Sequence, residues 1–173
     1  DDRPAFVDGL RHGNVTSLAR RDLSKPVVAA VNGLAFGGGM ELVLACDLAV
    51  AAPETTFGLP EVKHGLVAAA GGLVRGPRQL PVKVLLDLAL TGEAMTSAQA
   101  LTWGLVSRVV DDPVAEALGM ATTIAGHPSQ GAVRASRNAV RRGLDAFLED
   151  EGGAWDLVEP ELMQVLLAGR RKE

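Results

Sequence analysis

The sequence contains few of the residues on which several classes of protein depend. It has no Tyr, an aromatic content of 3%, and one cysteine, Cys46, in 173 residues. One cysteine cannot form a disulfide within the chain, so a fold stabilised by its own disulfides is excluded. The scarcity of aromatic side chains argues against a binding site built on stacking. The cysteine content fits a reducing compartment, and we expect a cytoplasmic protein.

Long apolar runs and an excess of basic charge are also absent. No stretch approaches the roughly 20 apolar residues that a membrane-spanning helix requires, and Asp1–Pro4 lack the basic and apolar segments of a signal peptide. The net charge is -4 and both signs are scattered along the chain, so no basic face is indicated. We therefore expect a protein that binds neither nucleic acid nor membrane.

The composition that remains is suited to a tightly packed α/β core. Hydrophobic residues make up 47% of the chain, which is long enough for one domain with a substantial core. Short apolar, β-branched runs bounded by turn residues predict buried strands, and longer periodic runs predict helices. The expected strands are 27–31, 48–52, 55–58 and 105–110. The expected helices are 37–47, 71–78, 81–90, 97–103 after a Thr96 cap, 113–125, 129–142 and 144–167, with a shorter one near 17–22.

A glycine triplet, Gly37–Gly39, lies between the first buried strand and the helix that follows, and Glu41 lies one turn into that helix. Glycines let a ligand approach the main chain closely. The unpaired N–H groups at a helix N-terminus favour negative charge. This corner is therefore able to bind a phosphate or to stabilise the oxyanion of an enolate.

The residues after the triplet favour the oxyanion. A P-loop requires Lys and Ser or Thr after its last glycine, whereas Met40 and Glu41 follow here, and the glycine spacing does not match the dinucleotide fingerprint. An acid beside such a corner indicates proton transfer next to a polarised carbonyl. Two structural readings remain open at this point. The glycines could serve close packing, and Glu41 could stabilise the helix dipole.

A second acid, Glu61, follows a short expected strand and Pro60. The elements between Glu41 and Glu61 could bring the chain back over the glycine corner. Two carboxylates in one dry site hold their protons differently, as addition of water to a double bond requires. Glu61 could instead be an ordinary turn residue.

The same segments closely resemble the crotonase (enoyl-CoA hydratase/isomerase) superfamily. The resemblance is continuous from about Lys25 to Val110 and looser through the helical C-terminal part. It implies an α/β fold, a spiral of β-β-α units with a C-terminal helical trimerisation region, and a homotrimer or homohexamer. The motifs that carry it are KPVVAAVNGLAFGGGMEL (25–42), Cys46-Asp47, Phe57-Gly58-Leu59-Pro60-Glu61 and Gly71-Gly72.

The resemblance also implies roles for particular residues. The Gly38 N–H would donate to the oxygen of a coenzyme A thioester. Glu41 and Glu61 would hold the attacking water and exchange a proton with the α-carbon of a trans-2-enoyl-CoA. Gly37, Ala69 and Gly71 would contact the substrate. No metal or other cofactor is implied, because the acyl-CoA is itself the substrate.

The sequence departs from the family pattern in two places. Ala68-Ala69-Ala70-Gly71-Gly72 stands where hydratases have Pro-Gly-x-Gly-Gly, so Ala69 could crowd the water site. The family also has N-terminal β-β-α units before the Lys-Pro motif that this chain lacks. An isomerase, another crotonase-type enolate enzyme and a non-catalytic acyl-CoA-binding scaffold are the alternatives to a hydratase. We divide the chain into a core at 1–112 and a helical region at 113–173.

Three other reactive side chains are interpreted as structural. His64 is expected at the surface or in a supporting position near Glu61. Cys46 is expected to be a small core residue, as free cysteines often are. Asp47 is expected to cap or bridge neighbouring elements.

Overall fold

A computed structural model describes residues 25–145, with side chains described through Arg141. The helix expected near 17–22 and most of the one expected at 144–167 lie outside the described residues. The strands are β1 (Val28–Val31), β2 (Leu34–Phe36), β3 (Leu48–Ala51), β4 (Thr56–Gly58), β5 (Ala94–Thr96) and β6 (Arg108–Val109). The helices are α3 (Gly38–Ala45), the 3-10 turn η1 (Pro60–His64), α4 (Gly72–Gln79), α5 (Val82–Thr91), α6 (Ser97–Thr102), α7 (Pro113–Ala125) and α8 (Gln130–Asp145).

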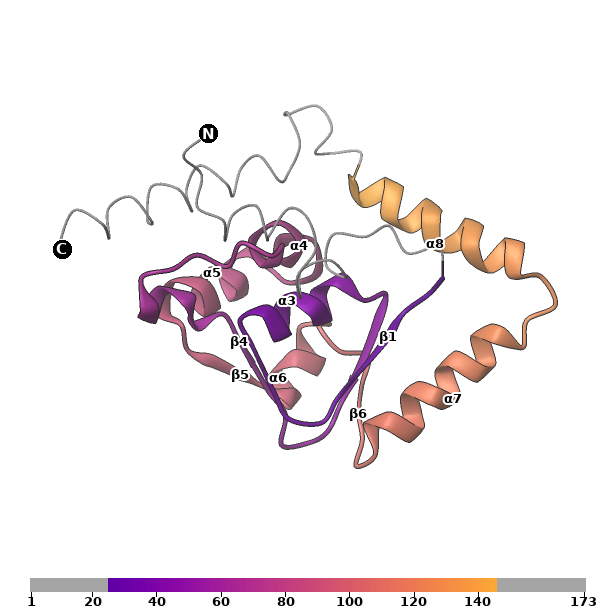
Figure 1. Cartoon of the computed structure of the whole chain (residues 1–173), viewed down its shortest axis with the longest axis horizontal. Helices are drawn as coiled ribbons and strands as arrows, with labels where there is room; N and C mark the ends of the chain where they lie inside the picture. The colour runs from indigo at the N-terminus through magenta and orange to yellow at the C-terminus, as the bar shows by residue number, and fades with distance from the viewer. Residues whose placement is uncertain (1–24, 146–173) are drawn as a thin grey trace, which may run out of the picture.

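The first four strands alternate between two three-stranded sheets. One sheet has the order β1-β3-β6 with parallel pairing, and the other has the order β2-β4-β5. β4 pairs parallel with β2 and antiparallel with β5. From β1 to β4 the chain thus passes from one sheet to the other at each step, and α3 connects the first pair of strands to the second (Figure 1). This is the strand-pair spiral that a β-β-α unit produces.

The two sheets and the helices that cover them share one hydrophobic core. Buried apolar side chains from α3, β3 and β4 meet others from α5 and α6 in a single cluster. Phe57 and Met40 are fully buried in it. The central strands are almost continuously apolar because both of their faces are covered. None of the helices within residues 25–145 is long and apolar enough to cross a bilayer.

α7 lies against β1 and β3, and the chain turns at its end so that α8 runs back above it in the view of Figure 1. The bounds of α7 are the predicted ones, 113–125, with Asp112 capping the N-terminus through a bond from the Ala115 N–H. Thr96 and Gln99 form a reciprocal capping box on α6, as the Thr96 cap predicts. The division of the chain at residue 113 stays a prediction.

Some sequence predictions are wrong in extent or in kind. The strand expected at 105–110 is reduced to Arg108–Val109, because Leu105 and Val106 turn into the core and their N–H groups bond to the Ala100 carbonyl. Leu34–Phe36 and Ala94–Thr96 are strands that the sequence did not predict. Each has three residues, which is too short for a recognisable period, and each is stabilised by pairing with β4.

Candidate active site

The N-terminus of α3 is an exposed corner at the end of β2. Gly37 is the N-cap, with φ 54, and its N–H donates to the Gly58 carbonyl at 3.0 Å, which ties the corner to β4. A positive φ of this size favours glycine. Gly38 begins the helix and is exposed, and its N–H has no acceptor among residues 25–145. The corner therefore presents an open donor at the positive end of a helix.

Glu41 lies in the first turn of α3 and is buried, with 3% of its surface exposed. Its Oε1 atom accepts hydrogen bonds from the Ala70 N–H at 2.7 Å and the Gly72 N–H at 2.9 Å. A buried carboxyl requires such partners. The two main-chain donors hold this oxygen in one position as a hydrogen-bond acceptor.

The segment before α4 wraps closely around the Glu41 side chain. Gly71, the N-cap of α4, has φ 115, and a Cβ on Gly72 would lie 3.1 Å from both Cγ and Oε1 of Glu41. Ala69 is buried at 9% exposure beside these donors. Small residues are therefore needed where the main chain binds the acid. Whether Ala69 affects a water molecule stays a prediction.

Glu61 reaches the same corner from the other side. It follows Pro60 in η1, and its Oε1 atom lies 3.2 Å from where a Cβ on Gly37 would be. Its Oε2 atom is buried and has no hydrogen-bond partner within the described part of the chain. Burial raises the pKa of the Glu61 carboxyl, opposed by a bond from its own main chain and by the charge of His64.

The structure thus brings Glu41, Glu61 and the Gly38 N–H to one end of α3. One acid is fixed as an acceptor by two amides, and the other is half-buried beside the N-cap in surroundings that favour its protonated form. The open N–H lies at the same helix end. An open N–H with two differently held acids is an arrangement that can stabilise an oxyanion and transfer protons beside it.

The remaining reactive side chains have structural surroundings. His64 is exposed. The Cys46 thiol donates to the Leu42 carbonyl at 3.3 Å, and burial followed by the charge of Asp47 raises the pKa of this thiol, which disfavours a nucleophilic thiolate. Asp47 accepts from the Val27 N–H and from Nε of Arg137 and of Arg141, each at 2.9 Å. The prediction that Asp47 bridges elements is confirmed.

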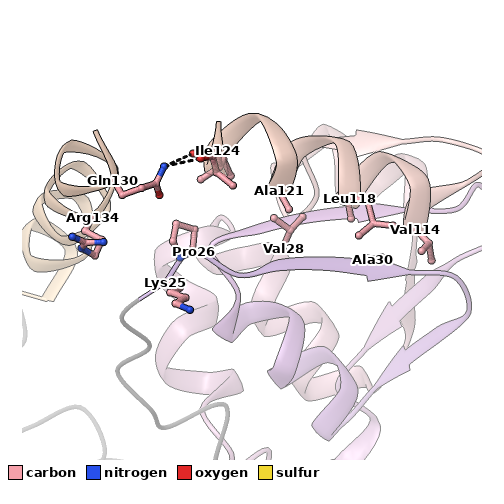
Figure 2. A pocket seen from close by; sticks show the side chains of 12 residues that line it. Lys25, Pro26, Val28, Ala30, Val114, Leu118, Ala121, Ile124, Gln130 and Arg134 are labelled. Atoms are coloured by element: carbon pink, nitrogen blue, oxygen red, sulfur yellow. Dashed lines mark hydrogen bonds between the residues drawn. The ribbon is translucent and has the colours of Figure 1, made fainter. Parts of the chain in front are cut away.

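Two cavities lie away from this corner. The first, of about 540 Å³, is an apolar groove in which α7 faces β1, lined at one end by Lys25, Gln130 and Arg134 (Figure 2). The second, of about 710 Å³, lies at the C-terminal end of α3 near Asp47 and α8. Glu41 and Glu61 line neither of them. The candidate site is therefore identified by its carboxyl and amide geometry.

The described residues contain no cluster of metal-binding side chains. Across residues 25–145, no three His, Cys, Asp or Glu side chains are grouped so that they could hold a metal ion.

Sequence reasoning missed the main-chain donors to Glu41. The small residues Ala68–Gly72 stand out in the sequence, but nothing in their spacing indicates that the amides of Ala70 and Gly72 bind a carboxylate 29 and 31 residues earlier. The available signal was the need of a buried acid for hydrogen-bond donors near a stretch of glycine and alanine.

The comparisons with known proteins match the same region. A family model described as Enoyl-CoA hydratase/isomerase matches residues 12–155. A carnitinyl-CoA dehydratase from Salmonella arizonae is 53% identical over 89 residues, which cover 51% of this chain and 34% of that protein. The chain thus matches about a third of the length of this curated relative.

The matches with solved structures cover more of this chain than the match with the curated relative does. A carnitinyl-CoA dehydratase from Mycobacterium avium 104 is 44% identical with a TM-score of 0.79, and the match covers 90% of this chain and 61% of that one. An enoyl-CoA hydratase from Mycobacterium tuberculosis H37Rv is 32% identical with a TM-score of 0.78, covering 87% of this chain and 67% of that one. The chain therefore belongs to the enoyl-CoA hydratase/isomerase family, the crotonase superfamily.

Proposed function

We propose that this chain carries the proton-transfer site of an enoyl-CoA hydratase, which adds water reversibly and in the syn sense across the double bond of a trans-2-enoyl-CoA thioester. The observation that carries the proposal is the pair of differently held carboxyls, Glu41 and Glu61, at the end of α3 where the Gly38 N–H is open. Neither acid alone would supply both a base for water and a proton for carbon.

Each group has one task in the hydration direction. Glu41 accepts a proton from water as the water oxygen bonds to the β-carbon. The electron pair of the double bond moves toward the thioester carbonyl, whose oxygen becomes the enolate oxygen and accepts a hydrogen bond from the Gly38 N–H. Glu61 gives its proton to the α-carbon, and the enolate becomes the 3-hydroxyacyl thioester. Transfer of the proton from Glu41 to Glu61 through solvent restores the starting state.

The raised pKa of Glu61 supports its role as the proton donor. Burial keeps a fraction of this carboxyl protonated at a pH where an ordinary glutamate is ionised. In the reverse direction the ionised Glu61 takes the α-proton and Glu41 protonates the departing hydroxyl. The same geometry therefore serves dehydration of a 3-hydroxyacyl-CoA.

The substrate class follows from this chemistry and from the names of the relatives. The reaction needs an acyl-CoA thioester and no metal or redox cofactor. Relatives are named carnitinyl-CoA dehydratase, carnitinyl-CoA hydratase and enoyl-CoA hydratase. We therefore take crotonyl-CoA and carnitinyl-CoA as the first substrates to test. The homotrimer or homohexamer stays a prediction, which sedimentation velocity of the purified chain would test.

The proposal is tested by following the absorbance of the conjugated thioester of crotonyl-CoA. Absorbance is expected to fall with the wild-type chain. Because general acid and base groups contribute about 10²–10⁴-fold each, Glu41→Gln and Glu61→Gln should lose at least about 10²-fold in kcat. Lys83→Met, at an exposed position of α5, serves as the unaffected control.

Different outcomes identify the alternatives. Double-bond migration without 3-hydroxyacyl product would indicate an isomerase. Thioester binding with no turnover of any of these substrates would indicate a non-catalytic acyl-CoA-binding protein. Equal activity of wild type and both Gln variants would contradict the roles assigned to the two acids.

A further inference from the structure

The turn that carries Glu61 has little internal support. η1 has five residues, none of them buried, and it ends at Gly65 in the left-handed region with φ 66. The bonds that close it are Gly65 N–H to the Val62 carbonyl at 3.2 Å and Leu66 N–H to the Glu61 carbonyl at 3.0 Å. Short 3-10 segments have poor hydrogen-bond geometry. The position of the Glu61 carboxyl therefore depends on what η1 packs against.

η1 packs against α5, and just past the end of α5 its Lys63 side chain contacts Gly92 and pairs with Glu93. Lys63 Nζ lies 2.9 Å from Glu93 Oε1. The stem of Lys63 runs over Gly92, where an added Cβ would lie 2.8 Å from Cε and 3.0 Å from Cγ of the lysine. Gly92 also has φ 68, which side chains rarely adopt. The space at position 92 is thus filled by the lysine stem, and the backbone there, the C-cap of α5, favours glycine as well.

The ion pair closes a frame around Glu61. At one side of the turn, Gly58 pairs with Ala94 across β4 and β5, and the Gly58 carbonyl accepts the N–H of the helix N-cap, Gly37. At the other side, Lys63 binds the residue directly before Ala94. The segment from Gly58 to Lys63 is therefore attached at both ends to residues 93–94, and Glu61 lies between the two attachment points.

We propose that Lys63, Gly92 and Glu93 form a positioning brace that holds the Glu61 carboxyl against Gly37 and so sets the rate of its proton transfer. The inference rests on the proposed function. None of the three residues is assigned contact with reacting atoms, so each acts through the placement of Glu61.

The kinetic test compares three brace variants with the wild type. Lys63→Met keeps the stem and removes the charge, and Glu93→Gln removes the opposite charge. An exposed pair contributes up to about 1 kcal/mol, so each should lower kcat by up to about fivefold with little change in KM. Gly92→Ala displaces the stem itself at a residue whose φ of 68 favours glycine, and should lower kcat by about 10-fold through the shift that reaches Glu61.

Rescue and a matched control separate positioning from general damage. The exchanged pair Lys63→Glu with Glu93→Lys should recover kcat relative to either single change. Arg108 and Glu116 form another exposed ion pair, between β6 and α7, and Arg108→Met should leave kcat unchanged. Equal kcat in the wild type and all brace variants would overturn the proposal.

A second readout does not depend on turnover. The carboxyl carbon of Glu61, observed by NMR in ¹³C-glutamate-labelled protein, reports the pKa of this group, and His64→Gln is titrated alongside because its charge acts on the same carboxyl. Loosening the brace should hydrate Glu61 and move its pKa down toward the ordinary 4.5. If the wild type hydrates no thioester, the proposed function fails, but this titration still shows whether Lys63, Gly92 and Glu93 position the Glu61 carboxyl. An unchanged pKa in Gly92→Ala would refute it.

Discussion

Glu41 and Glu61 carry the same functional group in two different surroundings. Glu41 receives two main-chain N–H bonds on one oxygen, while the Oε2 atom of Glu61 is buried without a hydrogen-bond partner in the described residues. A buried oxygen without a donor is costly when charged and less so when protonated. The difference between the acids is thus a difference in the donors that the main chain supplies.

The surroundings of Glu61 predict a pH-dependent gain in stability from Glu61→Gln. Because burial places the pKa of the folded carboxyl above 4.5, the folded state binds the proton more tightly than the unfolded state. The stabilisation that the protonated Glu61 gives the folded state is fully present below the pKa of this group in the unfolded chain. It is lost as the pH rises through the higher pKa of the group in the folded protein. The variant should therefore have the higher Tm at about pH 8 and the same Tm at about pH 4, measured by circular dichroism.

The space around Glu41 predicts a loss of activity from Gly72→Ala. The new Cβ would lie 3.1 Å from Oε1 of Glu41 and 3.3 Å from Cδ2 of Leu59, so the carboxyl must move. Because the shift needed is smaller than the roughly 1 Å that costs about 10²-fold, we expect kcat for thioester hydration to fall by about 10-fold. Gly119→Ala, on an exposed face of α7 with no atom within 4 Å, is the control and should stabilise the helix by about 0.5–1 kcal/mol. Equal kcat for both variants would show that the Gly72 contact does not matter.

At the scale of elements, one carboxylate connects α8 to the strands. Asp47 lies between α3 and β3, and its oxygens receive the Val27 N–H and the guanidinium groups of Arg137 and Arg141 from α8. Arg141 also donates to the Ala45 carbonyl at the C-terminal end of α3. The Asp47 and Arg137 side chains are only 13% and 7% exposed, so solvent screens this contact weakly. The cluster therefore holds α8 to the far end of the helix that begins the candidate site.

Asp47→Asn should loosen α8. The substitution removes the charge that two guanidinium groups share, and the free energy of unfolding should fall by about 1.5–3 kcal/mol in urea titrations. Amide hydrogen exchange in α8 should accelerate more than in α3. Asp112→Asn is the matched control, because Asn caps α7 as well as Asp does. Unchanged exchange in α8 would contradict the bridging role.

The elements that sequence predicts well are those with strong local signals. Pro113 at the start of α7 and the pair of Thr96 before α6 and Gln99 in its first turn are capping signals that act within one turn. The three-residue strand at Ala94–Thr96 has no such signal, because its pairing partner, β4, lies 40 residues earlier, as in Thr56↔Thr96. The same limit applies to the site. Residue types identify Glu41 and Glu61 as candidates, but the amides of Ala70 and Gly72 become neighbours only through the fold.

At the scale of the whole molecule, one core joins the two sheets to α3, α5 and α6, so we expect this part of the chain to unfold as one cooperative unit. Buried side chains of both sheets and of the helices from α3 to α6 belong to one cluster, including Leu85 and Leu88 of α5. α5 also supports η1, which carries Glu61. Loss of packing in α5 should therefore lower the stability of the entire unit, since small domains with one core usually unfold in one step.

Two leucines of α5 have the same side chain but differ in burial, so their variants measure the effect of burial alone. Leu88 is 4% exposed in the core, whereas Leu90, two residues on, is 70% exposed. Leu88→Ala should lower the free energy of unfolding by about 2–5 kcal/mol through lost burial and the cavity left behind. Leu90→Ala should change it by less than about 0.5 kcal/mol. Urea titrations followed by circular dichroism and by tryptophan fluorescence should give coincident midpoints for each variant. Separate midpoints for Leu88→Ala would mean that α5 melts independently and that the core is not one unit.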